Sequence, residues 1–268
     1  MRAWCWRKRG GSVGSKTAWV LAWGLCGTLV QAAVPTAKLP AASPAMPYLN
    51  PKAQTVRVEA FQMDVYPVTN RQFAEFVRRY PQWQRGRADA RQTDSATYLR
   101  HWAQAHAPAA ADADKPVTNL SWFAANAYCR AQNKRLPLTA EWEYAAMASP
   151  TARNGTHQAA YRRVFNDWYA AGDKRVLRTV GRGQANIWGI HDLHGLIWEW
   201  TEDFNNALLI PDANGMRGGE FCGIPANAAV GTSNHGAFIR LNMRSRLQPH
   251  FAMPFLGFRC VAPVRRSA

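Results

Sequence analysis

Long hydrophobic runs are scarce in this 268-residue sequence. The apolar stretch from Thr17 to Val30 carries no charge, but it is shorter than the roughly 20 residues that a membrane-spanning helix needs. It follows residues 1–16, in which every charge is basic, and small residues such as Ala32 follow it. This order is typical of a secretory signal peptide over residues 1–32. It predicts a periplasmic or secreted protein with no stable membrane span after cleavage, and a retained N-terminal anchor is the alternative.

Acidic residues are few, with 17 Asp and Glu against 33 Lys and Arg, so the formal net charge is +16. Removal of residues 1–32 takes away five basic residues and no acidic one, which leaves the mature chain at +11. Such a charge attracts anionic partners, among them nucleic acids. The basic residues are scattered along the chain, however, and export argues against nucleic acid. We therefore predict a generally basic, solvated surface and no nucleic-acid partner.

Cysteine is also sparse, with five residues in the whole chain. Cys5 and Cys26 lie in the predicted signal peptide, so the mature protein keeps Cys129, Cys222 and Cys260. Disulfides form in exported proteins. Three cysteines allow one bridge and leave one thiol over.

Composition divides the mature chain into a linker, a domain and a tail. Residues 33–53 are rich in Pro and Ala, which is typical of an extended tether, and residues 264–268 form a basic tail. No composition shift divides residues 54–263, so we predict a single domain there. A hydrophobic content of 47% with 12 Trp residues is enough for a substantial core.

Three helices are predicted in the first half of this domain. Thr69 begins a capping-box pattern ahead of an aromatic stripe, and Ser121 and Thr139 are the predicted caps of two further helices. Beyond Pro150 the sequence consists of short apolar pieces separated by Gly, Asn and Pro, which predicts loops and short strands. The expected class is α+β with little regular secondary structure.

Four separated motifs then occur in order along the chain. They are VYPVTNRQFAEFV at 65–77, KPVTNLSWFAANAYC with KRLPLTAEWEYAA at 115–146, GIHDLHGLIWEW at 189–200, and RGG with GFRC at 217–260. Together they resemble the formylglycine-generating enzyme family, also called sulfatase-modifying factor domains, over about residues 55–262. The resemblance implies a variant of the C-type lectin fold. The best-known members oxidise a cysteine of sulfatases to formylglycine with copper, molecular oxygen and two active-site cysteines. Residues 191–205 and 238–247 are similar to secreted members that accompany copper nitrite reductases.

The resemblance also implies which cysteines pair. The AYC and GFRC motifs match the positions of a structural disulfide in the family, which joins Cys129 to Cys260 and leaves Cys222 as the odd thiol. Closing a loop of this length stabilises a protein by on the order of 4 kcal/mol in the entropic model. Two buried free thiols are the alternative.

A calcium loop is the next implication of the resemblance. By position, its ligands are the side chains of Asp192 and Glu199 and the backbone carbonyls of Gly195 and Ile197. Hard oxygen ligands on an irregular loop suit a structural calcium ion. In the alternative interpretation, the two carboxylates accept hydrogen bonds from backbone amides of the loop.

The resemblance places Cys222 in the active cleft and gives Trp198 and Arg244 catalytic positions. The enzymes hold copper between two thiolates a few residues apart, because monovalent copper prefers sulfur. Here the residue five positions after Cys222 is Asn227, and Glu220 replaces the Ser that usually follows RGG. A two-cysteine copper site therefore cannot be built. From the residues alone, Trp198 also suits a core, and Arg244 also suits a pair with a buried acid.

Three functions from different classes remain. The missing second cysteine favours a monomeric periplasmic maturation or accessory factor for a protein partner or exported protein substrate, such as a periplasmic redox metalloenzyme. The first alternative is an oxygen-dependent oxidoreductase that uses Cys222 alone, or a copper ion held with His235, Met243, His250 or Met253. The second alternative is a lectin-like module for glycans or peptides, which rests on fold analogy alone.

Overall fold

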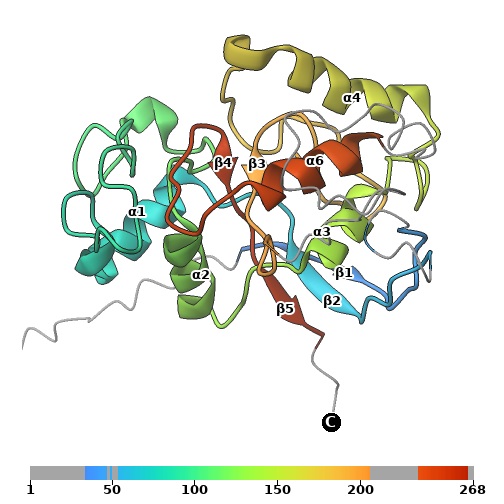
Figure 1. Cartoon of the computed structure of the whole chain (residues 1–268), viewed down its shortest axis with the longest axis horizontal. Coiled ribbons are helices and arrows are strands. Elements are labelled where there is room, and N and C mark those ends of the chain that lie inside the picture. Colours follow the sequence, from blue (N-terminus) through green and yellow to red (C-terminus); the bar gives the residue numbers. More distant parts are fainter. Residues whose placement is uncertain (1–33, 47–48, 50–53, 206–234, 265–268) are drawn as a thin grey trace, which may run out of the picture. The chain divides into compact units, whose positions relative to one another are not determined.

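A three-stranded antiparallel sheet brings together segments from the two ends of the domain (Figure 1). The computed structural model describes residues 34–46, 49, 54–205 and 235–264, all of which belong to one compact unit. Strand β1 (Thr36–Leu39) pairs with β2 (Phe61–Asp64), and β2 pairs with β5 (Val261–Pro263). Alternate residues of β1 are buried, as expected for a strand with one face on the core.

The prediction of an extended tether over residues 33–53 is wrong for the described part of that stretch. Ala37 and Leu39 of β1 are buried on the core side of the sheet, and Met46 is fully buried. Isolated bridges also join Ala42 to Val58 and tie the chain beyond β1 to the domain. Pro and Ala composition suggested a tether, but apolar burial and backbone pairing make the segment part of the fold.

The three helices predicted in the first half of the domain are present. Helix α1 (Asn70–Arg79) begins with the predicted capping box, in which the Thr69 side chain accepts from the Gln72 amide and the Gln72 side chain accepts from the Thr69 amide. Helix α2 (Trp122–Ala131) is capped by Ser121. Helix α3 (Thr139–Ala146) begins one residue earlier than predicted, so its N-cap is Leu138.

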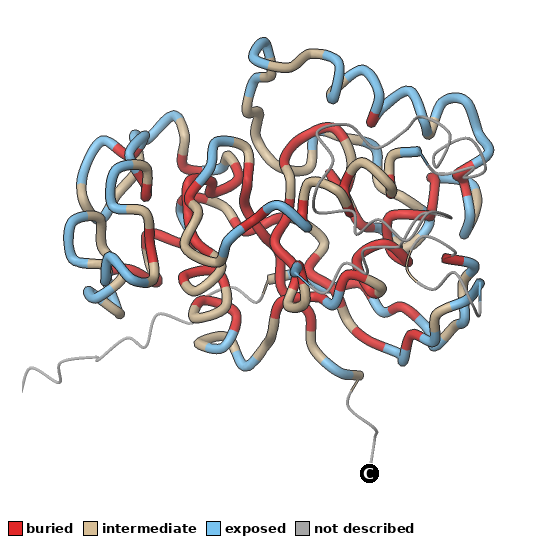
Figure 2. The backbone as a smooth tube through the Cα atoms, viewed as in Figure 1, coloured by how far each residue is buried: buried red, intermediate tan, exposed pale blue. Residues whose placement is uncertain are grey.

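Two helices in the second half were not predicted. Helix α4 (Ala159–Ala170) lies largely in solvent and buries Phe165 alone (Figure 2), so it shows no periodic apolar stripe. Helix α6 (His235–Ser245) has the expected buried spacing, but two of its four buried residues are Arg240 and Arg244. Arginine at core positions conceals the helical period from an argument based on hydrophobicity.

The remaining elements are short. Strands β3 (Trp198–Glu199) and β4 (Leu256–Gly257) form a parallel pair. Single 3₁₀ turns occur at η1 (Pro81–Trp83), η2 (Ala110–Asp112) and η3 (Gly172–Lys174). The α+β class with little regular secondary structure is therefore confirmed. Among the described residues, no helix combines the length and the apolar character needed to cross a membrane.

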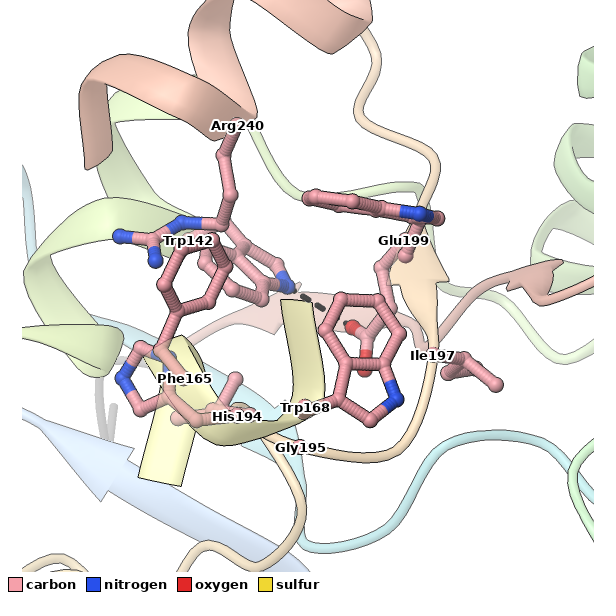
Figure 3. A pocket seen from close by; sticks show the side chains of 10 residues that line it. Trp142, Phe165, Trp168, His194, Gly195, Ile197, Glu199 and Arg240 are labelled. Carbon is pink, nitrogen blue, oxygen red and sulfur yellow. Dashed lines mark hydrogen bonds between the residues drawn. The ribbon is translucent and has the colours of Figure 1, made fainter. Parts of the chain in front are cut away.

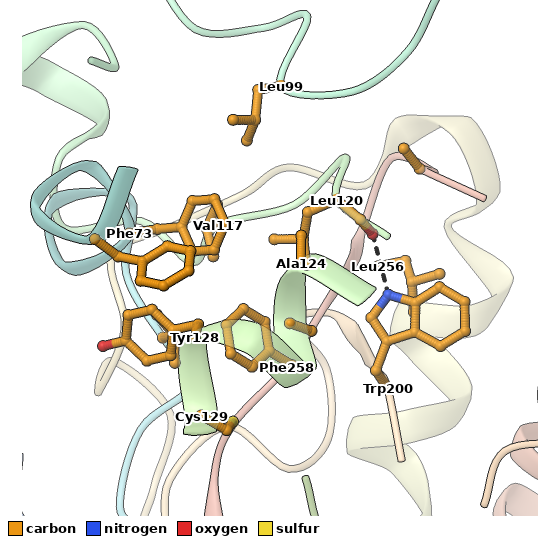
Figure 4. Close-up of a cluster of buried hydrophobic side chains, with 14 of the residues drawn as sticks. Phe73, Leu99, Val117, Leu120, Ala124, Tyr128, Cys129, Trp200, Leu256 and Phe258 are labelled. Carbon is orange, nitrogen blue, oxygen red and sulfur yellow. Dashed lines mark hydrogen bonds between the residues drawn. The ribbon is translucent and has the colours of Figure 1, made fainter. Parts of the chain in front are cut away.

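An aromatic core packs against the disulfide, with Cys129 at its edge beside Tyr128 and Phe258 (Figure 4). The rings of Phe73, Tyr128 and Phe258 pack against one another at centroid distances of 5.3–6.2 Å. Cys129 of α2 is bonded to Cys260 beside β5, across 131 positions of sequence. The expected pairing of these two cysteines is thus present, and it fixes the C-terminal segment to the middle of the domain.

Candidate functional site

An aromatic pocket lies where α3, α4, α6 and the loop over residues 192–199 meet (Figure 3). We call it the aromatic pocket and define it by its lining residues, namely Trp142, Phe165, Trp168, Leu193, His194, Gly195, Ile197, Trp198, Glu199 and Arg240. The space in it that a water-sized molecule can enter is about 10 Å³, which is room for about one water molecule. Four of the lining side chains are Trp or Phe, and two carry charge, which is the composition of a site that binds apolar surface and orients it with a few polar groups.

Two arginines of α6 bind the same carboxylate, and one of them, Arg240, lines the aromatic pocket. Arg240 contacts Glu143 through Nε at 2.9 Å, and Arg244 contacts it through Nη1 at 2.8 Å. Both guanidinium groups also lie over the Trp142 ring, at 5.0 and 4.7 Å from its centroid. Burial raises the pKa of Glu143, but the two arginines outweigh burial and hold that pKa below its ordinary value.

A second buried ion pair lies behind Trp142. The Glu199 carboxylate accepts from Nε and Nη2 of Arg259, each at 2.8 Å, and from Nε1 of Trp142 at 2.8 Å. Arg259 further donates to the backbone carbonyls of Asp64, Val65 and His191, which anchors the pocket to the sheet. The carboxylate and guanidinium therefore satisfy each other at zero side-chain exposure.

His194 contributes an uncharged imidazole to the aromatic pocket. Burial, assisted by the positive charge of Arg240, lowers the pKa of His194 to about 4. Its Nε2 lies 2.9 Å from the Ala146 carbonyl, so in the neutral ring Nε2 donates and Nδ1 is an acceptor. Within the described part of the chain, His194 Nδ1 and Trp168 Nε1 are buried and have no hydrogen-bond partner. Each of these two polar atoms is thus buried beside aromatic rings without a described partner.

Three of the four predicted calcium ligands, Asp192, Gly195 and Glu199, have protein partners. Asp192 accepts from the backbone amides of Gly181 and Gly183, and the Gly195 carbonyl accepts from Arg178. Glu199 is saturated by Arg259 and Trp142, as described above. Backbone amides were the alternative interpretation for both carboxylates, and this interpretation holds for Asp192 only. Arranged in this way, these oxygens do not fit a calcium ion, which needs six to eight oxygens directed at one point.

Of the three predicted catalytic residues, Trp198 and Arg244 are described by the structure and Cys222 is not. Trp198 lines the aromatic pocket and is half-buried. Arg244 is 1% exposed and pairs with the buried Glu143, which is the contact that its alternative interpretation expected. Cys222 lies outside the described residues, as do Glu220 and Asn227.

The soft ligands proposed for a copper site are not seen to converge. Met243 packs against the aromatic core, Met253 is exposed, and the ring of His250 contacts Phe251. In residues 34–46, 49, 54–205 and 235–264 there is no group of three His, Cys, Asp or Glu side chains that could hold a metal ion. Any copper site that includes Cys222 would draw on residues beyond those described.

Sequence reasoning missed the residues that build most of the pocket. Phe165 and Trp168 lie in a helix that was not predicted, and the pairing of Glu143 with Arg240 was not predicted either. The spacing of Arg240 and Arg244, four residues apart, was the available signal, because residues at i and i+4 share one helix face. Two arginines on the same face as Ala237 and Leu241 indicate a buried acidic partner.

The fold and the disulfide place this protein among α+β domains in which irregular backbone surrounds a few short strands and helices. Within that class, the chain belongs to the sulfatase-modifying factor family, because residues 31–264 match the family described as sulfatase-modifying factor enzyme 1-like domain. This confirms the family resemblance that the four motifs carried.

Three relatives are particularly informative. "Inactive C-alpha-formylglycine-generating enzyme 2" of Bos taurus is 29% identical over 247 residues, which covers 79% of this chain and 80% of the relative. The Mus musculus protein of the same name is 28% identical over 249 residues, with 80% and 79% covered. The "Formylglycine-generating enzyme" of Mycobacterium tuberculosis is 31% identical over 199 residues, with 55% and 64% covered. The chain is therefore similar both to relatives named as inactive and to one named as the enzyme.

Proposed function

We propose that the mature protein is an exported, non-catalytic accessory or maturation factor that binds a protein partner in the periplasm. The observation that carries this proposal is the shortage of thiols. Cys129 and Cys260 are joined to each other, so Cys222 is the one cysteine left after residue 32. Copper held between two thiolates, the chemistry of the active family members, needs a second cysteine that the chain does not supply. Similarity to two relatives named as inactive supports the same conclusion.

The aromatic pocket is the proposed binding site for the partner. Its Trp and Phe side chains favour contact with an apolar group of a protein, since aromatic residues are enriched at protein interfaces and Trp among their energetically dominant residues. An exported redox metalloenzyme is the partner class we propose, on the basis of the similarity at residues 191–205 and 238–247.

Catalysis is tested with a peptide of the type Cys-x-Pro-x-Arg. The purified protein is incubated with this peptide, copper and oxygen, and the peptide mass is measured, with an active formylglycine-generating enzyme as the positive control. We expect an unchanged mass. A mass loss that matches conversion of the thiol to an aldehyde would establish the oxidoreductase alternative instead. A titration with monovalent copper, in which the wild type and Cys222→Ala bind equally, would further exclude a Cys222 copper site.

Partner binding is tested by capture from a periplasmic extract, followed by identification of the retained proteins. We expect one specific protein, and we expect Trp168→Ala to release it. Val176→Ala is the matched control, because Val176 is 77% exposed and does not line the pocket. A protein that binds both variants equally would show that the aromatic pocket is not the binding site.

Export is tested by N-terminal sequencing of the protein from a fractionated cell. We expect a mature N-terminus close to residue 33 in the periplasmic fraction. A chain that keeps residues 1–32 and stays with the membrane would show that the segment is an anchor rather than a cleaved signal.

A further inference from the structure

The guanidinium of Arg178 lies between two oxygens that the family resemblance assigned to calcium. Its Nη1 donates to the Gly195 carbonyl at 2.7 Å, and its Nη2 lies 3.7 Å from Oδ1 of Asp192. The Asp192 side chain is fully buried, whereas that of Arg178 is 41% exposed. The positive charge next to Asp192 and Gly195 is therefore supplied by the Arg178 guanidinium, a side chain of the protein.

At the other end of the loop, Glu199 is also paired with an arginine. Both oxygens of Glu199 accept from Arg259, and one of them also accepts from Trp142. A calcium ion placed between Asp192 and Glu199 would have to displace these donors and lie close to guanidinium groups of the same charge sign. The carboxylates of Asp192 and Glu199 therefore both accept hydrogen bonds from protein donors.

We infer that Arg178 replaces calcium as the cation that holds the loop over residues 192–199. An arginine suits this role because its planar fork can direct one N–H group to a carbonyl and another toward a carboxylate. The backbone amides of Gly181 and Gly183, from the same segment as Arg178, complete the hydrogen bonding of Asp192. Three residues of the segment after η3, Arg178, Gly181 and Gly183, therefore hold the loop over residues 192–199 in place.

This replacement has a consequence for the aromatic pocket. Leu193, His194, Ile197 and Trp198 of the clamped loop line that pocket. The order of the pocket wall then depends on a covalently attached cation and not on the calcium concentration outside the cytoplasm. This inference is independent of whether the aromatic pocket binds a partner.

The first experiment measures thermal unfolding of the wild-type protein with millimolar calcium and with excess EGTA. We expect the same midpoint in both, and we expect no stoichiometric calcium binding by isothermal titration calorimetry. A lower midpoint in EGTA, or one calcium ion bound per chain, would overturn the inference. Because this experiment uses the wild type, it gives a decision even if the variants below fail to fold.

The second experiment compares Arg178→Ala with Arg182→Ala by unfolding and by amide hydrogen exchange of peptides that cover residues 192–199. Arg182 is exposed and lies four residues further along the same segment. We expect Arg178→Ala to lower the midpoint by roughly 2–4 °C, the shift typical of one lost interaction in a domain of this size, and to accelerate exchange in the loop. Equal exchange in the two variants would overturn the role given to Arg178.

Discussion

Arg259 holds Glu199 through two parallel hydrogen bonds of 2.8 Å, although the two residues are 60 positions apart in the sequence. Neither side chain has any exposed surface. Burying a single charge is costly, whereas a buried pair with two aligned hydrogen bonds largely offsets that cost. Loss of one partner should therefore lower the free energy of unfolding strongly, whereas replacement of both partners should lower it much less.

Replacement of Arg259 by Met is the first prediction. It leaves the Glu199 carboxylate with Trp142 as its remaining side-chain donor, so we expect a loss of about 3–5 kcal/mol in the free energy of unfolding. The measurement is urea denaturation. The double variant Glu199→Leu with Arg259→Met should lose less than Arg259→Met alone, because no charge is left buried. Arg91→Met, at an ion pair in which Arg91 is 89% exposed, is the control and should have no measurable effect. A single variant as stable as this control would contradict the argument.

The disulfide supplies the second prediction. The double variant Cys129→Ala with Cys260→Ala opens a loop that spans 131 positions, so we expect a loss on the order of 4 kcal/mol relative to the oxidised wild type. Urea denaturation of the variant, and of the wild type with and without a reductant, measures the effect. The reduced wild type should match the variant, since both lack the same constraint on the unfolded chain. Equal stability of the oxidised and reduced wild type would show that the disulfide does not stabilise the fold.

The outcome at α1, α6 and β1 shows which parts of the fold the sequence could predict. Helix α1 was found because its cap is local and its buried face carries Phe73, Phe76 and Val77. The buried face of α6 carries Arg240 and Arg244 in place of apolar residues, so its role depends on Glu143, which lies about a hundred positions away. Strand β1 was missed because Pro and Ala dominate its surroundings and its partner β2 comes later in the chain.

For the site, too, the sequence predicted residues within local motifs but not their distant partners. Trp198 and Glu199 were identified from their motif, and both line the aromatic pocket. The partner that each carboxylate takes could not be read from that motif. Arg178 lies in a stretch without a recognisable pattern, and only the folded chain brings it to Gly195. Motifs therefore located the loop, while the choice between a metal ion and a guanidinium was decided by distant residues.

The third prediction concerns pH and Glu143. Its pKa is held below the ordinary value by Arg240 and Arg244 despite burial, so its contribution to stability is present above the unfolded pKa of about 4.3 and is lost as pH falls through the folded pKa. We expect Glu143→Gln to cost on the order of 3 kcal/mol at neutral pH, because two buried guanidinium groups lose their shared carboxylate. Below pH 4.3 the difference from the wild type should shrink.

Urea denaturation across the acidic range measures that difference for Glu143→Gln. Glu59→Gln is the control, because the ion pair of Glu59 with Arg57 is exposed on both sides and should not alter the pH profile. A stability difference between Glu143→Gln and the wild type that stays constant from neutral pH down to strongly acidic pH would show that charge pairing is not what stabilises α6 against α3.

The last prediction concerns close packing at Gly257 in β4. A Cβ atom on this residue would lie 2.3 Å from the Val117 carbonyl oxygen and 2.8 Å from Cδ1 of Ile197. The carbonyl oxygen belongs to the backbone, so it cannot move away without displacing the strands beside it. We expect Gly257→Ala to lose on the order of 3 kcal/mol in the free energy of unfolding by urea denaturation. Gly189→Ala separates this clash from backbone strain, because Gly189 has a φ of 79° but open space around its Cβ position, and we expect it to lose about 1–2 kcal/mol. If Gly257→Ala is no less stable than Gly189→Ala, then the contact between β4 and the segment at Val117 is looser than these distances require.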